Sequence, residues 1–224
     1  MSGREPDPGP SCACDAAPSI SAYFDAKVRR MGTATTGAPH ATTLAILGLL
    51  GDPSGRSVLE LGAGRGGLLL DVLRHGAGSA TGIELSEASL DVARRRIAEA
   101  GFADRVELVV GDGASVALEP HDWVVLDRVI CCYPDADALV DHAAAAARLA
   151  LAFSLPESRG WRGVASRIAT FADNAWNSMR KASCTTFVHD LGRIDGILRS
   201  AGFVPSASAR RGLWFVAVYE RRDR

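Results

Sequence analysis

The stretch VLELGAGRGG, residues 58–67, constrains the fold more than any other part of the chain. It begins as an apolar run interrupted by one acid, Glu60, and opens into a glycine-rich loop. An apolar run that leads through glycines into a helical pattern predicts a strand–loop–helix unit of a parallel sheet. The glycines at 62, 64 and 67 fit the dinucleotide fingerprint, and those at 62, 64 and 66 fit the spacing common among S-adenosylmethionine (SAM) binders. The loop alone therefore leaves two cofactors open.

Strands and helices alternate after this loop. The pattern predicts strands over 57–61, 80–84, 106–110, 123–127 and 149–154, and helices over 67–75, 87–100 and 135–148. Residues 203–209 and 213–219 are also strand-like, but the three residues between them are too few for a parallel crossover. We therefore predict an α/β, Rossmann-like, doubly wound fold whose seven-stranded sheet is mostly parallel and ends in an antiparallel C-terminal hairpin.

Three segments flank the predicted sheet. Residues 1–18 are rich in Pro, Gly, Ser and Ala, and we expect a mobile tail followed by one domain over 19–224. Two helices, one beginning at Ile20 and one over 42–50, precede the first strand. The insertion 156–189 is long for a strand-to-helix connection and carries apolar residues at helical spacing. Its helix either packs on the sheet edge or serves as a substrate lid, and Arg162, Arg167 and Trp176 beside the stripe favour the lid.

The bulk composition narrows the classes of partner. The chain has 224 residues, 47% of them hydrophobic, and a net charge of -1 with acids and bases interleaved, which argues against binding nucleic acid or an anionic membrane. No apolar stretch reaches the length of a membrane span, and five cysteines suit free thiols in a reducing compartment. We expect a cytoplasmic protein with a small-molecule substrate and no metal, since no paired Cys or His spacing is present. The sequence does not indicate an oligomeric state.

Three acids bear on the choice of cofactor. Glu60 lies where dinucleotide folds usually have an apolar residue, so it either caps the N–H groups of the loop or meets a cationic ligand group, such as the ammonium of SAM. Glu84 ends the second strand, where a carboxylate accepts ribose hydroxyls, although a solvated acid is the alternative. Asp112, at the end of LVVGDG, is placed to accept the adenine amino group. Glu60 favours SAM over a dinucleotide.

Together with LDRV and the C-terminal hairpin, these motifs resemble the class I SAM-dependent methyltransferases over residues 42–155. The resemblance implies SAM as the cofactor and a binding site made of Glu60, Gly62, Ala63, Gly64, Glu84, Leu85, Asp112, Gly113, Asp127 and Arg128. The stretches LDRVICCYPD, FVHD and GLWFVAVYER look similar to small bacterial methyltransferases near the magnesium-protoporphyrin O-methyltransferases. That group commonly has FVHP where this chain has Asp190, and we do not transfer the porphyrin substrate.

The methyl acceptor should enter over the carboxyl ends of the strands. Transfer is an in-line displacement that depends on alignment and on excluding water. The candidate catalytic residues are His189, Tyr133 and Asp127, and the candidate substrate-binding residues are Tyr23, Phe24, Cys132, Trp161 and Trp176. His189, Tyr133 and Cys132 could equally be packed or hydrogen-bonded structural residues.

The main hypothesis is a small-molecule methyltransferase that uses SAM. A catalytically silent SAM-binding protein is the alternative, and Glu60 and the hairpin argue against an NAD-dependent reductase. The acceptor atom stays open.

Overall fold

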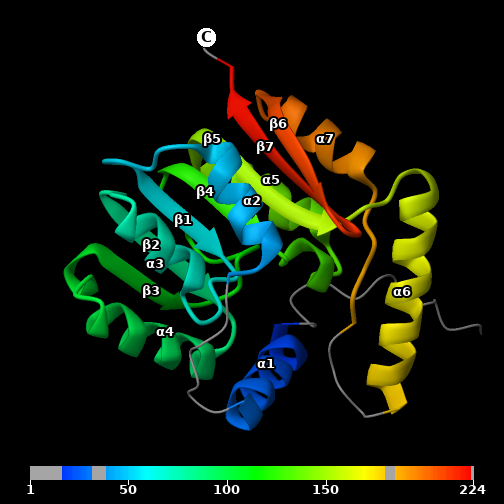
Figure 1. The fold of residues 1–224 in the computed structure, drawn as a ribbon, viewed down its shortest axis with the longest axis horizontal. Helices are drawn as coiled ribbons and strands as arrows, with labels where there is room; N and C mark the ends of the chain where they lie inside the picture. Colours follow the sequence, from blue (N-terminus) through cyan, green and yellow to red (C-terminus); the bar gives the residue numbers. More distant parts are fainter. Residues whose placement is uncertain (1–16, 32–38, 180–184, 223–224) are drawn as a thin grey trace, which may run out of the picture.

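The computed structural model describes residues 17–31, 39–179 and 185–222. One seven-stranded sheet runs through it in the order β3-β2-β1-β4-β5-β7-β6 (Figure 1). The strands are β1 (Ser57–Leu61), β2 (Ser79–Glu84), β3 (Val106–Val110), β4 (His121–Asp127), β5 (Ala147–Pro156), β6 (Phe203–Arg211) and β7 (Trp214–Arg221). Every neighbouring pair from β3 to β5 is parallel, whereas β7 is antiparallel to both β5 and β6. The predicted Rossmann-like fold with an antiparallel C-terminal hairpin is confirmed.

Helices cover both faces of the sheet (Figure 1). One face carries α2 (Ala41–Leu50), α3 (Gly67–Arg74) and α4 (Glu87–Glu99), and the other carries α5 (Ala136–Ala146) and α7 (Leu191–Ser200). The sequence of β1 explains why both faces are covered. Successive side chains of a strand point to opposite faces, and β1 has apolar side chains on both. Val58 packs in one cluster with Ile46 and Val72, whereas Leu59 packs in another with Leu139. Side chains on both faces of β1 are therefore buried, as expected for a parallel strand with helices on both sides.

The N-terminal helix α1 (Ala17–Met31) begins two residues before the predicted domain boundary. Residues 1–16, with Cys12 and Cys14, lie outside the described residues, so the mobile tail stays a prediction. The Ser21 hydroxyl donates to the carbonyl of Leu85 at 2.9 Å, and the Ser86 hydroxyl donates to Asp25 at 2.6 Å. These two bonds attach α1 to the residues that directly follow β2.

The insertion after β5 contains the expected helix, α6 (Gly160–Met179), which lies at the edge of the molecule (Figure 1). Its apolar stripe does not pack on the sheet edge: Trp161, Ile168 and Phe171 are 71%, 65% and 76% exposed. That packing alternative is wrong.

The strand order reverses between β1 and β4, because the chain proceeds outward from β1 to β3 on one side and from β4 to β6 on the other. In open parallel sheets, ligands bind outside the carboxyl ends of the strands at this switch point. The candidate site is therefore expected where β1 and β4 end, at Leu61 and Asp127.

Candidate cofactor and active site

The loop after β1 has a backbone that only glycine adopts without strain. Gly62, Gly64 and Gly66 have φ values of +74°, +51° and +71°. A Cβ on Gly62 would lie 2.2 Å from Cγ2 of Val129, which follows β4. The glycine at 62 thus lets the loop pass directly against the end of the neighbouring strand, across the switch point.

The N–H groups of this loop are largely used within the protein. Gly62 and Ala63 donate to the carbonyl of Ile83 at 2.7 and 3.0 Å, and Gly66 donates to that of Ala63 at 2.9 Å. Gly64 donates to the carboxylate of Glu84 at 2.8 Å. A pyrophosphate-binding loop directs such groups at the ligand. Four of these groups point at protein acceptors instead.

Glu60 lies beneath the loop and is 5% exposed. The backbone N–H of Leu69, in the first turn of α3, donates to its carboxylate, but Oε2 has no hydrogen-bond partner. Burial, and then the nearby charges of Asp127 and Glu84, raise the pKa of Glu60 well above its ordinary value of 4.5. Both predicted roles are thus compatible: one oxygen caps the start of α3, and the other remains for a cationic group.

Glu84 ends β2 and is held in place by the backbone on both sides. One carboxylate oxygen accepts the N–H of Gly64 at 2.8 Å, and the other accepts the N–H of Ser86 at 2.9 Å. Burial is the main cause that raises the pKa of Glu84. Each carboxylate oxygen has a second lone pair. The side chain can therefore accept ribose hydroxyls in the position predicted for it, next to Leu85.

Asp112 follows β3 and is paired with Tyr133, which follows β4 in the chain. The Tyr133 hydroxyl donates to its two carboxylate oxygens at 2.9 and 2.8 Å, and the Ala114 N–H donates to it at 3.0 Å. A Cβ on the neighbouring Gly113 would lie 3.5 Å from Cβ of the β1 residue Leu61. Tyr133, a predicted catalytic residue, is only 4% exposed. The Tyr133 hydroxyl thus contacts Asp112, the residue predicted to accept the adenine amino group.

Asp127 ends β4 and accepts two hydroxyl groups. The hydroxyls of Thr43 and Ser154 donate to its two oxygens, each at 2.5 Å. Arg128, the next residue, has φ +62°, an uncommon conformation for a residue other than glycine. Its guanidinium lies 5.3 Å from the ring centroid of Trp214, and its Nε is buried without a hydrogen-bond partner. Such local strain concentrates at functional sites.

Several residues of this constellation carried no sequence signal. Thr43 and Ser154 lie far from Asp127 in the chain, and Trp214 begins β7, so no motif spacing connects them. His40 precedes α2, and its pKa is lowered by burial and by the charge of Arg128, while Asp127 acts in the opposite direction. Only the tertiary fold brings these groups to the end of β4.

His189 joins two segments of backbone. Its Nε2 lies 3.0 Å from the carbonyl of Tyr133, and the N–H of nearby Phe187 donates to the carbonyl of Cys131 at 2.7 Å. Burial lowers the pKa of His189, although the carbonyls beside the ring oppose this effect. The residue thus connects the segment before α7 to the turn η3 (Ile130–Cys132), which includes the half-buried Cys132.

Residues 58–150 match a family model described as "Methyltransferase domain". This segment contains every predicted cofactor residue, from Glu60 to Arg128. The match covers less than half of the chain, and it agrees with the class I SAM-dependent methyltransferase family predicted from the sequence.

A solved structure similar to this methyltransferase is magnesium protoporphyrin IX methyltransferase from Synechocystis PCC 6803 with bound SAH, the demethylated product of SAM. It superposes with a TM-score of 0.73 at 18% identity and covers 93% of this chain and 100% of that chain. At this identity the likeness shows the fold.

Two curated relatives match shorter segments. A polyamine aminopropyltransferase of Korarchaeum cryptofilum is 36% identical over 31% of this chain. An aclacinomycin 10-hydroxylase of Streptomyces purpurascens is 40% identical over 38% of it. The matched segments span 24% and 22% of these relatives, about a quarter of their length. Because both are named for other reactions, such a match does not define the group that is transferred.

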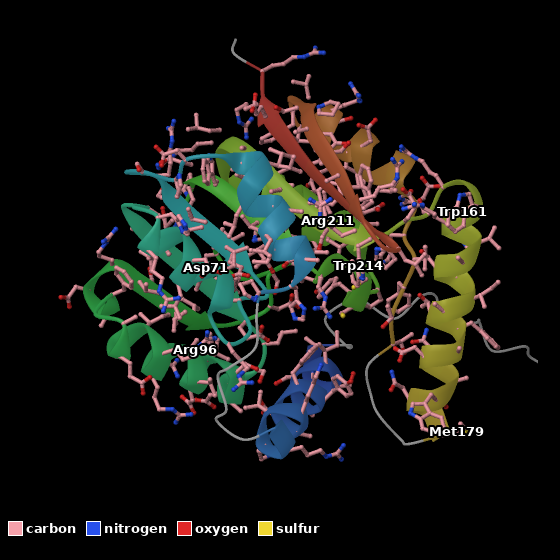
Figure 2. All side chains as sticks on the ribbon, in the orientation of Figure 1. Asp71, Arg96, Trp161, Met179, Arg211 and Trp214 are labelled. Atoms are coloured by element: carbon pink, nitrogen blue, oxygen red, sulfur yellow. The ribbon has the colours of Figure 1, made fainter. Side chains whose placement is uncertain are left out.

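Four of the five predicted substrate residues lie on two separate helices, and the fifth, Cys132, lies in the η3 turn. Tyr23 and Phe24 form an edge-to-face pair on α1, with ring centroids 5.2 Å apart. Trp161 and Trp176 lie on α6 and are 71% and 52% exposed. Figure 2 shows Trp161 at one end of α6, apart from Trp214 near the end of the sheet. The structure thus does not bring the two tryptophans to the acidic cluster.

No helix in the described ranges has both the length and the apolar character of a membrane span. Within the same ranges, no three His, Cys, Asp or Glu side chains gather into a group suited to a metal ion.

Proposed function

We propose that this methyltransferase binds SAM across the carboxyl ends of β1, β2 and β4 and transfers the sulfonium methyl group to a small-molecule acceptor. The observation that carries the proposal is the unpartnered, buried Oε2 of Glu60, which lies close to the charges of Glu84 and Asp127. A ligand with an ammonium and a sulfonium group relieves the repulsion among these acids. The pyrophosphate of a dinucleotide would increase it.

The cofactor residues face four parts of the ligand. Glu60 faces the ammonium, and the main chain of Gly62, Ala63 and Gly64 borders the methionyl part. Glu84 accepts the ribose hydroxyls, and Leu85 borders the adenine. The remaining members are Asp112 and Gly113 beside the adenine amino group, and Asp127 and Arg128 near the methyl group.

SAM supplies a methyl group activated by a positively charged sulfur. The residues of this chain then have to orient the acceptor and exclude water. The α1 helix suits the second task, because Ser21 and Asp25 fasten it to the residues beside Glu84. Tyr23 and Phe24 on this helix are the aromatic side chains we assign to the acceptor, together with Cys132 on the η3 turn.

His189 and Tyr133 are better assigned as positioning residues than as general bases. A ring nitrogen of His189 lies at a backbone carbonyl, and the Tyr133 hydroxyl lies on Asp112. Both contacts fix the turn that follows Arg128. A base needs a free lone pair within reach of the acceptor proton. Asp127, with both oxygens already accepting hydroxyls, orders the same turn through Ser154, which also accepts the N–H of Arg128.

A small-molecule acceptor agrees with the weak net charge of -1, which offers no field for a nucleic acid. The similar structure from Synechocystis is named for a tetrapyrrole substrate, which is also a small molecule. A silent SAM-binding protein and an NAD-dependent reductase are not favoured, the reductase because of the acidic cluster.

The test is product formation from SAM. The full chain is incubated with SAM and either the low-molecular-mass or the macromolecular fraction of a cell extract, and SAH is quantified. SAH formation dependent on the small-molecule fraction supports the proposal. Formation with only the macromolecular fraction overturns the acceptor class, and binding of SAM without SAH formation in any fraction favours the silent protein.

A further inference from the structure

The two faces of α6 are inverted relative to those of an ordinary surface helix. The face directed at the protein is small and polar, and consists of Gly163, Ser166, Thr170, Asn174 and Asn177, each buried or half-buried. An ordinary surface helix turns its apolar stripe toward the core. Here the apolar stripe points away from the domain that carries it.

This outer stripe consists of Trp161, Val164, Ile168, Phe171, Ala175 and Met179. Its five large members are 60–76% exposed. Figure 2 shows Trp161 and Met179 at opposite ends of α6, so the stripe extends along the whole helix. A helix of 20 residues is about 30 Å long. We estimate that the stripe presents on the order of 600 Å² of apolar surface, which is large for the surface of a monomer.

Few contacts hold α6 to the rest of the described chain. Arg162 and Ser166 donate to the carbonyls of Gly212 and Leu213 at 3.1 and 3.4 Å. Asn174 exchanges two hydrogen bonds of 2.8 Å with the backbone of Thr186. These polar contacts orient the helix. They do not account for the apolar side chains on its opposite face.

The segments outside the described residues lack the large apolar side chains that would be needed to cover the outer stripe. Residues 1–16, 32–38, 180–184 and 223–224 together contain no Leu, Ile, Val, Phe, Trp or Tyr. Burying five large apolar side chains requires comparable apolar surface on the covering segment. A second copy of this chain carries such a surface in its own stripe.

We propose that the outer stripe of α6 pairs with the same stripe of a second copy of this chain. The stripe residues are spaced by 3, 4, 3, 4 and 4 positions, close to the heptad spacing that lets two helices interlock side chains along a seam. A single stripe is sufficient, because a two-fold dimer uses the same surface on both subunits. Two stripes bury about 1,200 Å², at the lower end of the range for specific, stable interfaces.

The charged residues on α6 are more compatible with pairing to a second copy of this chain than with binding to an anionic membrane. The helix carries two arginines, Arg162 and Arg167, and one acid, Asp173. Segments that bind anionic lipid carry clusters of about 4–8 basic residues. The pairing does not depend on the proposed methyl transfer.

Sedimentation velocity of the full chain, from low to high micromolar concentration, tests the pairing. The wild type should form dimers, and Phe171→Glu combined with Ile168→Glu should raise the dimer dissociation constant at least about tenfold. Leu44→Glu is the matched control, because Leu44 is 56% exposed on α2, and this variant should dimerise normally. A monomeric wild type overturns the proposal, as does a stripe variant that still dimerises.

A second measurement needs no variant and remains informative if the stripe variant fails to fold. Amide hydrogen exchange of the wild type should slow over residues 160–179 as the protein concentration rises. Exchange there that does not depend on concentration overturns the pairing. Protection of α6 only on vesicles of zwitterionic or anionic lipid, with a monomer in solution, assigns the stripe to a membrane and also overturns it.

Discussion

The Glu84 carboxylate accepts the N–H of Gly64 at 2.8 Å, so the acid that ends β2 holds the glycine loop that follows β1. Its other oxygen accepts the N–H of Ser86, where α1 is attached. One side chain thus connects the loop, the ribose position and the covering helix.

Replacing Glu84 by Ala should weaken SAM binding by about 1–3 kcal/mol, because the ribose hydroxyls and the Gly64 N–H lose a charged acceptor. Calorimetric titration of the variant with SAM measures the effect. Asp91→Ala is the control, since Asp91 pairs with Arg94 on the exposed side of α4. Equal affinities of the Glu84 and Asp91 variants would contradict the assignment of Glu84.

Glu60→Gln should stabilise the protein without ligand and weaken SAM binding about tenfold or more. The pKa of Glu60 is raised in the folded state, so this state binds more protons than the unfolded chain above pH 4.5, and stability falls as pH rises through that window. Glutamine removes this penalty, and the Tm advantage of the variant should grow with pH. A gain of 1 kcal/mol corresponds to about 2–4 °C for a chain of this size. A variant with lower Tm and unchanged SAM affinity would assign Glu60 to the scaffold.

Gly62→Ala should be more damaging than Gly55→Ala, although the two positions have similar φ values of +74° and +71°. Both substitutions introduce left-handed strain of about 1–2 kcal/mol. The new Cβ at position 62 also collides with Val129, whereas nothing lies within 4 Å of the one at 55. Thermal unfolding and SAM titration should show a loss of affinity for Gly62→Ala alone, and Val129→Ala in that background should partly restore it. Equal losses at both sites would contradict the close passage of the loop.

His189→Gln should make stability less dependent on acidic pH. The pKa of His189 is lowered below 6.5, so the unfolded chain binds more protons just below that pH, and stability falls as the solution is acidified through that window. Thermal unfolding between about pH 7.5 and 5.5 should show a smaller decrease in Tm for the variant than for the wild type. Once an acceptor is known, turnover within a few-fold of wild type confirms a positioning role. A loss of about 10²- to 10⁴-fold indicates a general base instead.

The cofactor-binding residues could be predicted from the sequence, because each stands in a short contiguous motif. Glu60, the loop glycines and Glu84 lie at or next to the ends of strands. The strand–loop pattern of each segment is therefore enough to predict that these residues lie at the same edge of the sheet. The groups around Asp127 come from α2, β5 and β7, and no local pattern records that they converge there. Periodicity likewise predicted α6 as a helix, since it identifies which residues share a face. It does not say what that face contacts, and the outward direction of the stripe required the structure.

Calorimetric titration of the purified full chain with SAM, SAH and NAD tests the assigned cofactor most directly. The cluster of Glu60, Glu84 and Asp127 predicts binding of SAM and SAH in the micromolar range, and no measurable binding of NAD. Binding of NAD without binding of SAM would contradict it.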